Sequence, residues 1–357
     1  MARERIVTAS TLPEDEPSRS GQLTLRPRKL SDYIGQPELI EKLRISVQAA
    51  KTRNEAMEHV LLHGPPGLGK TTLAHIVASE LNGSVPRITS GPALVRPTDL
   101  VSILTNLGRG DVLFIDEIHR IPAAVEEYLY PAMEDYCIDV MMGAGTHAQS
   151  MHMEIQPFTL IAATTRAGLL SGPMRSRFGI VHHLNFYSPE DLLRIVRRSA
   201  ELLNLPAEEK SLLLLAHRAR GTPRVVNRLL RRVRDFAVVR GQGQLTPAIT
   251  QDALDLEAVD AMGLDDLDRR FMRVLARDYD GGPAGLEALS ATMGEESDTL
   301  EDVVEPFLLQ IGFLRRTPKG RQLTVAGFAH IHLKPPAQSS ASQASTLFPT
   351  SEADRLR

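Results

Sequence analysis

The residues most able to do chemistry lie in the stretch HGPPGLGKTT, residues 63–72. From Gly64 to Thr71 it matches the pattern G-x-x-x-x-G-K-[ST], which is typical of loops that cradle nucleotide phosphates. Glycines let backbone N–H groups turn toward phosphate oxygens, and the following helix adds its positive N-terminus. We expect Lys70 to bring charge to the β- and γ-phosphates and the Thr71 hydroxyl to bind Mg²⁺. A Gly/Pro-rich loop could match by chance, but here an apolar run precedes the motif and a helical run follows it.

A second motif ends the apolar run DVLFIDE, residues 111–117. Asp116 is expected to hold Mg²⁺, directly or through water, and Glu117 to orient and polarise an attacking water. An isolated Asp-Glu pair at a strand end is often only a helix cap or a surface pair. Because this pair follows a phosphate loop by about 45 residues, it indicates nucleotide hydrolysis.

A third apolar run, FTLIAATT, ends in Thr164 and Thr165. A polar residue here could reach between the two nucleotide-bearing strands and contact the γ-phosphate or the lytic water. The alternative is a pair of ordinary strand-end threonines.

Three arginines follow in positions that could serve a phosphate. Arg175 and Arg177 lie in GPMRSRFG, and arginine suits the charge that develops on a transferring phosphate. A solvated basic loop is the competing interpretation. Arg224 lies in GTPR near the start of a helix, where it could sense the nucleotide when domains close.

The elements that must position these residues change in character along the chain. Up to about residue 186, short apolar runs alternate with helical stretches, which indicates a parallel α/β sheet. Residues 188–257 are wholly helical in pattern. Helical segments then lead into FLRRTPKGRQLTV, which predicts a β-hairpin with a Pro-Lys-Gly turn. We expect the following parts: 1–20, a loose N-terminal tail; 21–186, a large nucleotide-binding domain; 187–257, a small helical domain; 258–333, a head domain; and 334–357, a disordered tail.

Composition narrows the class of protein. The chain has 357 residues, 42% of them hydrophobic, and a formal net charge of −3, so nucleic-acid contacts would need local basic clusters. The single cysteine, Cys137, excludes an internal disulfide and is expected to be buried. No apolar run reaches the roughly 18–20 residues of a membrane span. The N-terminus lacks the features of a signal peptide. We expect a soluble cytoplasmic protein.

Taken in order, these motifs resemble AAA+ ATPases, and a longer set resembles the RuvB family. That set includes LRPRKLSDYIGQ, HGPPGLGKTTLA, FIDEIHR, YPAMEDY, RGTPRVVNRLLRRVRDFA and EDVVEPFLLQIGFLRRTPKGR. The resemblance covers roughly residues 22–330. It implies an AAA+ P-loop core of α/β class with a parallel sheet, a small all-helical lid and a C-terminal winged-helix head. It also implies an ATP-driven hexamer that encircles duplex DNA and drives Holliday-junction branch migration with RuvA and the RuvC resolvase, in recombination and DNA repair.

The same resemblance implies roles for individual residues. Asp116, Glu117, Thr165 (first sensor) and Arg177 (arginine finger of the neighbouring subunit) would serve hydrolysis, with Thr71 and Asp116 at Mg²⁺. Arg316 and Arg321 would contact DNA from the wing of the head. Binding of ATP or ADP would involve Leu25, Arg26, Gly67, Gly69, Lys70, Thr71, Thr72, Glu134, Asp135, Tyr136, Arg177, Tyr187 and Arg224, the last as the second sensor.

Two segments depart from the family pattern. Residues 137–155 correspond to a hairpin that docks RuvA, but here they contain two acids, four methionines and no Lys or Arg. Methionine adapts well at interfaces, so we expect docking to survive with altered detail. Ser297 stands where a basic residue is usual, which removes one expected DNA contact.

Two basic stretches could contact DNA. The wing stretch RRTPKGR has four cations in seven residues and no aromatic, Asn or Gln, which predicts binding to the DNA backbone without sequence preference. Residues 218–240 have eight arginines, but their apolar residues recur at helical spacing, which favours a packed sensor helix over a DNA surface.

Two other functions stay open at this point. One is another AAA+ class, such as a clamp loader or an initiator-like protein, which would share the core but not the RTPKGR head. The other is a scaffold that binds ATP without turnover, for which Glu117 would have no use.

Overall fold

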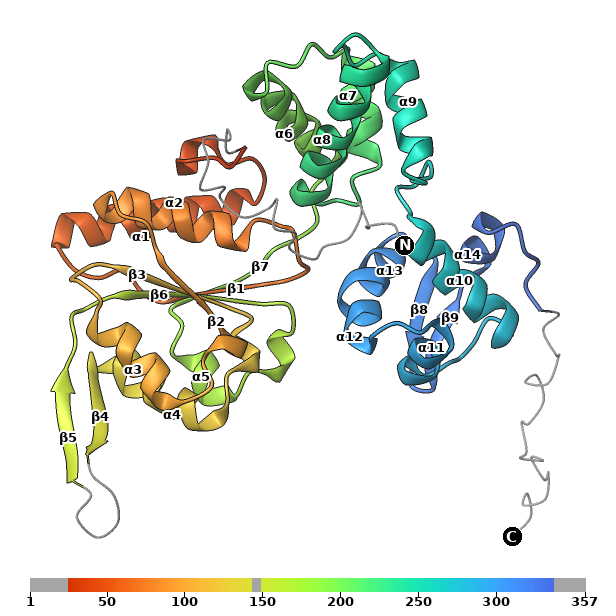
Figure 1. Cartoon of the computed structure of the whole chain (residues 1–357). Helices are drawn as coiled ribbons and strands as arrows, with labels where there is room; N and C mark the ends of the chain where they lie inside the picture. The colour runs from red at the N-terminus through yellow and green to blue at the C-terminus, as the bar shows by residue number, and fades with distance from the viewer. Residues whose placement is uncertain (1–24, 143–148, 337–357) are drawn as a thin grey trace, which may run out of the picture. The chain divides into compact units, whose positions relative to one another are not determined.

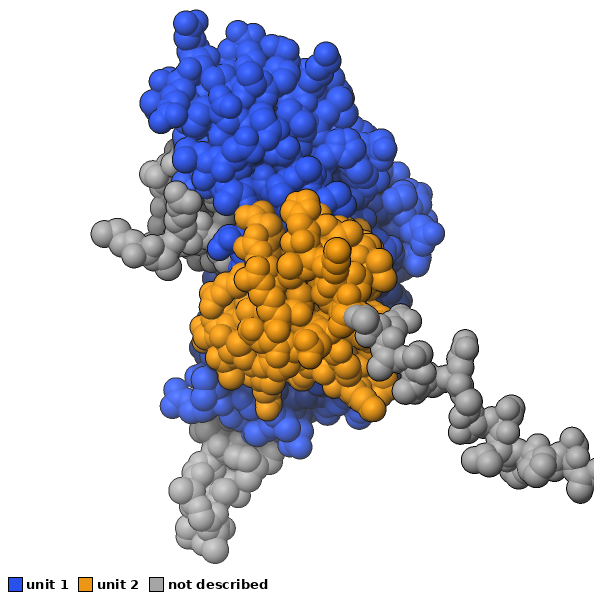
Figure 2. Space-filling view, turned by 90° about the vertical axis from the view of Figure 1, so that its right-hand side faces the viewer, with its two compact units in different colours: residues 1–268, 298–307 blue, residues 269–297, 308–357 orange. Residues whose placement is uncertain are grey.

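The computed structural model describes residues 25–142 and 149–336 of the chain (Figure 1). They fall into two compact units (Figure 2). The first holds the described residues up to Asp268 together with Asp298–Phe307, and the second holds Arg269–Ser297 and the described residues from Leu308 onward. The expected N-terminal tail, 1–20, lies outside the described residues. So do residues 337–357 of the expected C-terminal tail, 334–357.

The first unit is built on a five-stranded sheet in which every neighbouring pair is parallel. Its strand order is β2-β3-β6-β1-β7. The strands are β1 (Val60–His63), β2 (Arg87–Ser90), β3 (Val112–Asp116), β6 (Thr159–Thr164) and β7 (Ile180–His183). The expected parallel α/β sheet is confirmed. Because β6 lies between β1 and β3, the threonine strand separates the strands that carry the phosphate loop and the acidic pair.

Helices cover both faces of this sheet, as Figure 1 shows for α1 and α2 on one side and α3 and α4 on the other. Side chains one residue apart on a strand point to opposite faces. Leu62 and Phe114 therefore join the core under α1 and α2, while Leu61 and Leu113 join the core under α3 and α4. The helices are α1 (Pro37–Arg53), α2 (Lys70–Asn82), α3 (Pro97–Thr105), α4 (Ala123–Glu134) and the short α5 (Gly172–Ser176).

A hairpin of β4 (Cys137–Met142) and β5 (Gln149–Glu154) follows α4. Its base is part of the protein core, because Ile138 and Ile155 are buried there. Met151 is 42% exposed, whereas Met153 is partly buried and packs against the core. The expected Gly-Ala-Gly turn, residues 143–145, lies outside the described residues.

Four helices form the small helical part of the first unit: α6 (Pro189–Leu202), α7 (Glu209–His217), α8 (Pro223–Arg240) and α9 (Pro247–Leu256). The apolar stripe of α8 is buried as predicted: Val225, Val226, Leu229, Leu230 and Val233. The sequence did not predict the roles of the arginines in α8 and in the turn before it. Arg218, Arg220 and Arg228 are buried, and Arg220 forms an ion pair with the fully buried Asp268 at 3.0 Å.

The remaining elements follow the expected order of helices and then a hairpin. They are α10 (Asp266–Asp278), α11 (Leu286–Met293), α12 (Ser297–Thr299), a π-helical turn (Leu300–Val304), α13 (Glu305–Gln310), β8 (Leu314–Thr317), β9 (Gly320–Leu323) and α14 (Val325–His330). Arg316 and Arg321 lie directly opposite each other on β8 and β9. Within the described part of the chain, no helix is both long enough and apolar enough to cross a membrane.

Candidate nucleotide site

The backbone of the phosphate loop requires glycine at three positions. Gly64, Gly67 and Gly69 have φ angles of 135°, 83° and 102°, which L side chains rarely adopt. A Cβ at Gly69 would stand 2.6 Å from the Tyr33 hydroxyl, and one at Gly67 would stand 3.2 Å from Cβ of Arg224. The loop is therefore pressed between neighbouring side chains while its backbone takes the turns that phosphate binding needs.

Lys70 begins α2 and is buried, with 7% of the residue exposed. Its Nζ donates to the carbonyl oxygens of Gly64 at 2.8 Å and Pro65 at 3.0 Å. Burial lowers the pKa of Lys70 to about 8, although the nearby carboxylates of Glu117 and Asp116 oppose this shift. A buried lysine that donates to the carbonyl oxygens of its own loop is well placed to bind an anion, because a bound anion would stabilise its charged form. Thr71 and Thr72 follow in the first turn of α2 and are half-buried.

Asp116 and Glu117 lie at the carboxyl end of β3. The Glu117 N–H donates to Oδ1 of Asp116 at 3.0 Å. Burial raises the pKa of Asp116, the neighbouring Glu117 adds to this, and the charge of Lys70 opposes it. A carboxylate in this position, with the Thr71 hydroxyl, is the kind of oxygen donor set that suits Mg²⁺ beside phosphate.

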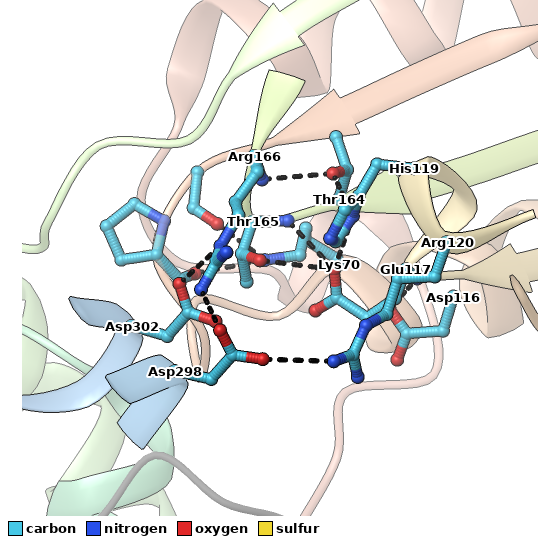
Figure 3. Close-up of polar contacts among 12 residues, drawn as sticks. Lys70, Asp116, Glu117, His119, Arg120, Thr164, Thr165, Arg166, Asp298 and Asp302 are labelled. Carbon is cyan, nitrogen blue, oxygen red and sulfur yellow. Dashed lines mark hydrogen bonds and ion pairs between the residues drawn. The ribbon is translucent and has the colours of Figure 1, made fainter. Parts of the chain in front are cut away.

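Glu117 is already engaged by donors from two other elements (Figure 3). Its Oε2 accepts from the N–H of Thr165 at 3.1 Å and from its hydroxyl at 3.2 Å. His119 Nδ1 lies 3.2 Å from the same oxygen and 2.9 Å from the Thr164 hydroxyl. Burial acts to raise the pKa of Glu117, but these donors outweigh it, so the pKa lies below its usual value. His119 was not predicted from the sequence as a site residue. Its position two residues after Glu117 could have indicated that it lies near that carboxylate.

Arg224 lies against the phosphate loop of its own chain. Its N–H donates to the Gly67 carbonyl at 3.3 Å, and its charge acts on the pKa values of both Lys70 and Asp116. The fold of a single chain thus gathers four predicted groups: the phosphate loop, the acidic pair, Thr165 and Arg224.

Two tyrosines brace the loop from the other side. The Tyr187 hydroxyl lies 2.8 Å from that of Tyr33, and each lies 3.1 Å from the Leu68 carbonyl oxygen. Burial raises both pKa values, that of Tyr33 to about 12, so the hydroxyls stay neutral. Tyr187 is therefore bonded to the phosphate loop as well as lying at the junction between sheet and lid.

Leu25 and Arg26 lie near α6 and α2. The buried Leu25 accepts at its carbonyl from Arg198 of α6 at 3.1 Å, and the charge of Arg26 helps to lower the pKa of His75 on α2 after burial, the main cause. This segment thus runs past the helix that begins with Lys70.

Arg177, in contrast, is held by α4 and α5. Its Nη2 lies 3.1 Å from Oε2 of Glu134, its Nη1 donates to the Pro173 carbonyl at 2.7 Å, and its guanidinium lies 4.1 Å from the ring centre of Tyr130. Glu134 and the following Asp135 and Tyr136 were expected beside the nucleotide. In the single chain, Glu134 contacts Arg177, Asp135 is exposed, and Tyr136 packs edge-on against Phe158.

A parallel sheet, a glycine-rich phosphate loop, an acidic strand end and a helical lid that touches the loop define a P-loop nucleotide-binding protein of the AAA+ class. Family models match nearly all of the described chain: the Holliday junction DNA helicase RuvB P-loop domain at residues 25–184, the RuvB AAA lid domain at 187–260, and the RuvB C-terminal winged helix domain at 261–332. The chain belongs to the RuvB family.

Solved structures agree with this assignment. The Thermotoga maritima RuvB Holliday junction branch migration motor is 48% identical, with a TM-score of 0.81, and the match covers 87% of this chain and 99% of that one. A single-residue variant of the same Thermotoga protein is also 48% identical, with a TM-score of 0.82 and the same coverage.

Proposed function

We propose that this protein hydrolyses ATP and uses the energy to pump duplex DNA as a hexamer, driving branch migration of Holliday junctions in recombination and repair. The observation that carries hydrolysis, rather than binding alone, is the Glu117 carboxylate. It lies at the same sheet edge as Lys70 and accepts hydrogen bonds from Thr165. A scaffold that only bound ATP would need no such water-orienting group.

Each residue has a step in this mechanism. Lys70 exchanges the carbonyls of its loop for phosphate oxygens, and Thr71 with Asp116 would hold Mg²⁺, which neutralises charge on the phosphates when bound. Glu117 turns from Thr165 toward a water and orients it in line with the γ-phosphate. Arg224 follows the phosphates from the lid side.

Arg177 is proposed to act on the nucleotide of the neighbouring subunit. The contacts given for its side chain are with α4 and α5 of its own chain and not with the phosphate loop. Glu134 would then lie in that same intersubunit contact. This makes hydrolysis depend on assembly.

The simplest test measures ATP turnover with and without circular duplex DNA. We expect turnover in both conditions and stimulation by DNA. ATP binding with no turnover in either condition would favour the scaffold, and turnover with no movement of a four-way junction would favour another AAA+ class.

DNA is proposed to bind the wing through Arg316 and Arg321, which stand opposite each other on the hairpin. Arg316→Ala with Arg321→Ala should weaken binding equally for unrelated duplex sequences. The slope of log affinity against log salt should fall by about 0.9 for each phosphate contact removed. An unchanged slope would place the DNA path elsewhere on the protein.

RuvA is proposed to dock on the hairpin 137–155, and RuvC to join the complex on the junction. Among the hairpin side chains that the structure describes, Met151 is apolar and exposed, whereas Ile155 is buried in the core. Met151→Glu should weaken RuvA affinity about tenfold or more, as loss of a central apolar contact does, while leaving ATP turnover unchanged. Full RuvA affinity would mean that the hairpin serves only its own core. The setting we propose for these activities is the cytoplasm.

A further inference from the structure

Arg166, the residue directly after the threonine pair of β6, is the centre of an ion-pair cluster (Figure 3). Its Nε lies 3.0 Å from Oδ1 of Asp302, and its Nη2 lies 3.0 Å from Oδ1 of Asp298 and 3.3 Å from Oε2 of Glu301. Arg120 reaches the other oxygen of Asp298 at 3.1 Å. Two arginines at the edge of the nucleotide site thus bind three acids that are more than 130 residues away from Arg166 in sequence.

The acids belong to a segment whose chemistry suits this contact and not a DNA contact. Residues 297–310 contain four acids and no Lys or Arg, so they would repel a phosphate backbone. Asp298–Phe307 also belongs to the same compact unit as the sheet and the lid. The segment includes the π-helical turn Leu300–Val304, an irregularity that is frequent at functional sites.

The cluster is connected to Glu117 through one stretch of backbone. The Arg166 N–H donates to the Thr164 hydroxyl at 3.0 Å, and the neighbouring Thr165 supplies two of the donors on Glu117 Oε2. Fixing the side chain of Arg166 therefore restrains the backbone that holds Glu117. With donors from Thr165 and His119 on that one oxygen, the carboxylate is less free to turn toward a water.

The acids also act on the phosphate site directly. The charge of Asp302 contributes to the electrostatics of Lys70, after the larger effects of burial, Glu117, Asp116 and Arg224. Negative charge near the place of the γ-phosphate opposes the entry of ATP.

We propose that residues 298–302 are a latch and that Arg166 is the positioning residue on which it closes. Closed, the latch holds the Thr165–Glu117 contact and keeps negative charge near Lys70. Released, it frees Glu117 for the attacking water and favours ATP. Because the chain runs on from this segment to the wing residues Arg316 and Arg321, DNA bound there can pull the latch open. The kinetic half of this proposal rests on the proposed ATP hydrolysis.

The latch itself can be tested without hydrolysis. Hydrogen exchange of the amides 298–307 would be followed in the full-length, nucleotide-free protein. Asp298→Asn with Asp302→Asn, and separately Arg166→Gln, should speed exchange in this segment. Glu287→Gln with Glu296→Gln removes the same charge from two exposed positions and should leave it unchanged. Exchange equal to wild type in both latch variants would overturn the proposal.

Kinetics then separate a latch from a merely structural contact. Without DNA, Asp298→Asn with Asp302→Asn should raise kcat about threefold to tenfold, as release of a hydrogen bond of ordinary strength would. The KM for ATP should fall, and the stimulation by DNA should shrink toward none. A lower kcat, or unchanged kcat and KM beside the control, would overturn it. If wild type binds ATP without any turnover, the proposed function fails, while hydrogen exchange and the affinity for a fluorescent ATP analogue still decide the latch.

Discussion

Two arginines were expected to act on nucleotide, Arg224 from the lid of its own chain and Arg177 as the arginine finger of a neighbouring subunit, and their surroundings in the structure differ. Arg224 begins the lid helix α8 and touches the phosphate loop of its own chain through Gly67. Arg177 directly follows α5, and its guanidinium contacts Glu134 and Tyr130 of α4. The fold of the chain places Arg224 against its own phosphate loop, whereas Arg177 forms an ion pair with Glu134.

The difference shows which parts of the machinery a single chain completes. Lys70, Asp116, Glu117 and Arg224 are close enough to influence one another's electrostatics. Arg177 has no place in that group of charges within the described residues. A chain alone can therefore be expected to bind nucleotide, and hydrolysis is expected to wait for a neighbour.

The largest effect should come from Arg177→Ala. An arginine finger is typically worth about 10³–10⁵ in rate where it has been dissected. We expect the variant to bind ATP normally and to hydrolyse it very slowly. Mixing it with Lys70→Ala should restore turnover, because each Lys70→Ala subunit can offer Arg177 to an intact phosphate loop next door. Mixed rings that never exceed either parent would place Arg177 in its own site or outside catalysis.

Glu117→Gln should follow, with turnover lowered by about 10²–10⁴, the usual contribution of a group that activates a water. The amide keeps the shape and leaves Lys70 and Asp116 in place, so ATP affinity should stay near wild type. Lys70→Ala provides the contrast, since it should lose affinity itself. Equal losses of affinity in the two variants, measured by titration with a fluorescent ATP analogue, would contradict this division of roles.

Arg224→Ala should lower turnover about 10- to 100-fold, as loss of one charge-assisted hydrogen bond would. Its value lies in the mixing experiment. If Arg224 serves its own site, mixing this variant with Lys70→Ala leaves every site deficient, and no turnover returns. Rescue equal to that of the Arg177→Ala mixture would erase the distinction between the two arginines.

The smallest effect is a pH dependence of nucleotide binding. The pKa of Lys70 is lowered to about 8 from the ordinary value of 10.5, so between these values the unfolded chain holds a proton that the folded site lacks. The contribution of Lys70 to the free energy of unfolding therefore rises with pH across that window. ATP binds the charged form of Lys70, so in the same window Lys70 must take up a proton when ATP binds. The Kd should rise by up to about tenfold per pH unit above pH 8. Calorimetry in two buffers should detect this proton uptake, and Lys70→Arg should abolish it, whereas an uptake that survives in Lys70→Arg would assign the proton to another group.

Much of the fold was predictable from local sequence. The strands β1, β3 and β6 are apolar runs because they are buried on both faces of the sheet. The edge strands β2 and β7 were not predicted, because Arg87–Ser90 and Ile180–His183 are short and partly exposed, and their polar residues resemble loop sequence. Their strand structure comes from pairing with β3 and β1.

The sequence by itself determined the phosphate loop, the acidic pair and the order of helices and strands. Those features depend on backbone preferences and apolar periodicity among near neighbours, which a short stretch of sequence already contains. Only the tertiary structure decided which charges meet. From the sequence, Arg220 could be interpreted as solvated, but in the structure it forms an ion pair with the buried Asp268. The sequence indicated no role for Arg166, which in the structure forms ion pairs with Asp298 and Asp302. The free energy of an ion pair depends on burial and distance, and for residues so far apart in sequence these are fixed only when the elements pack together.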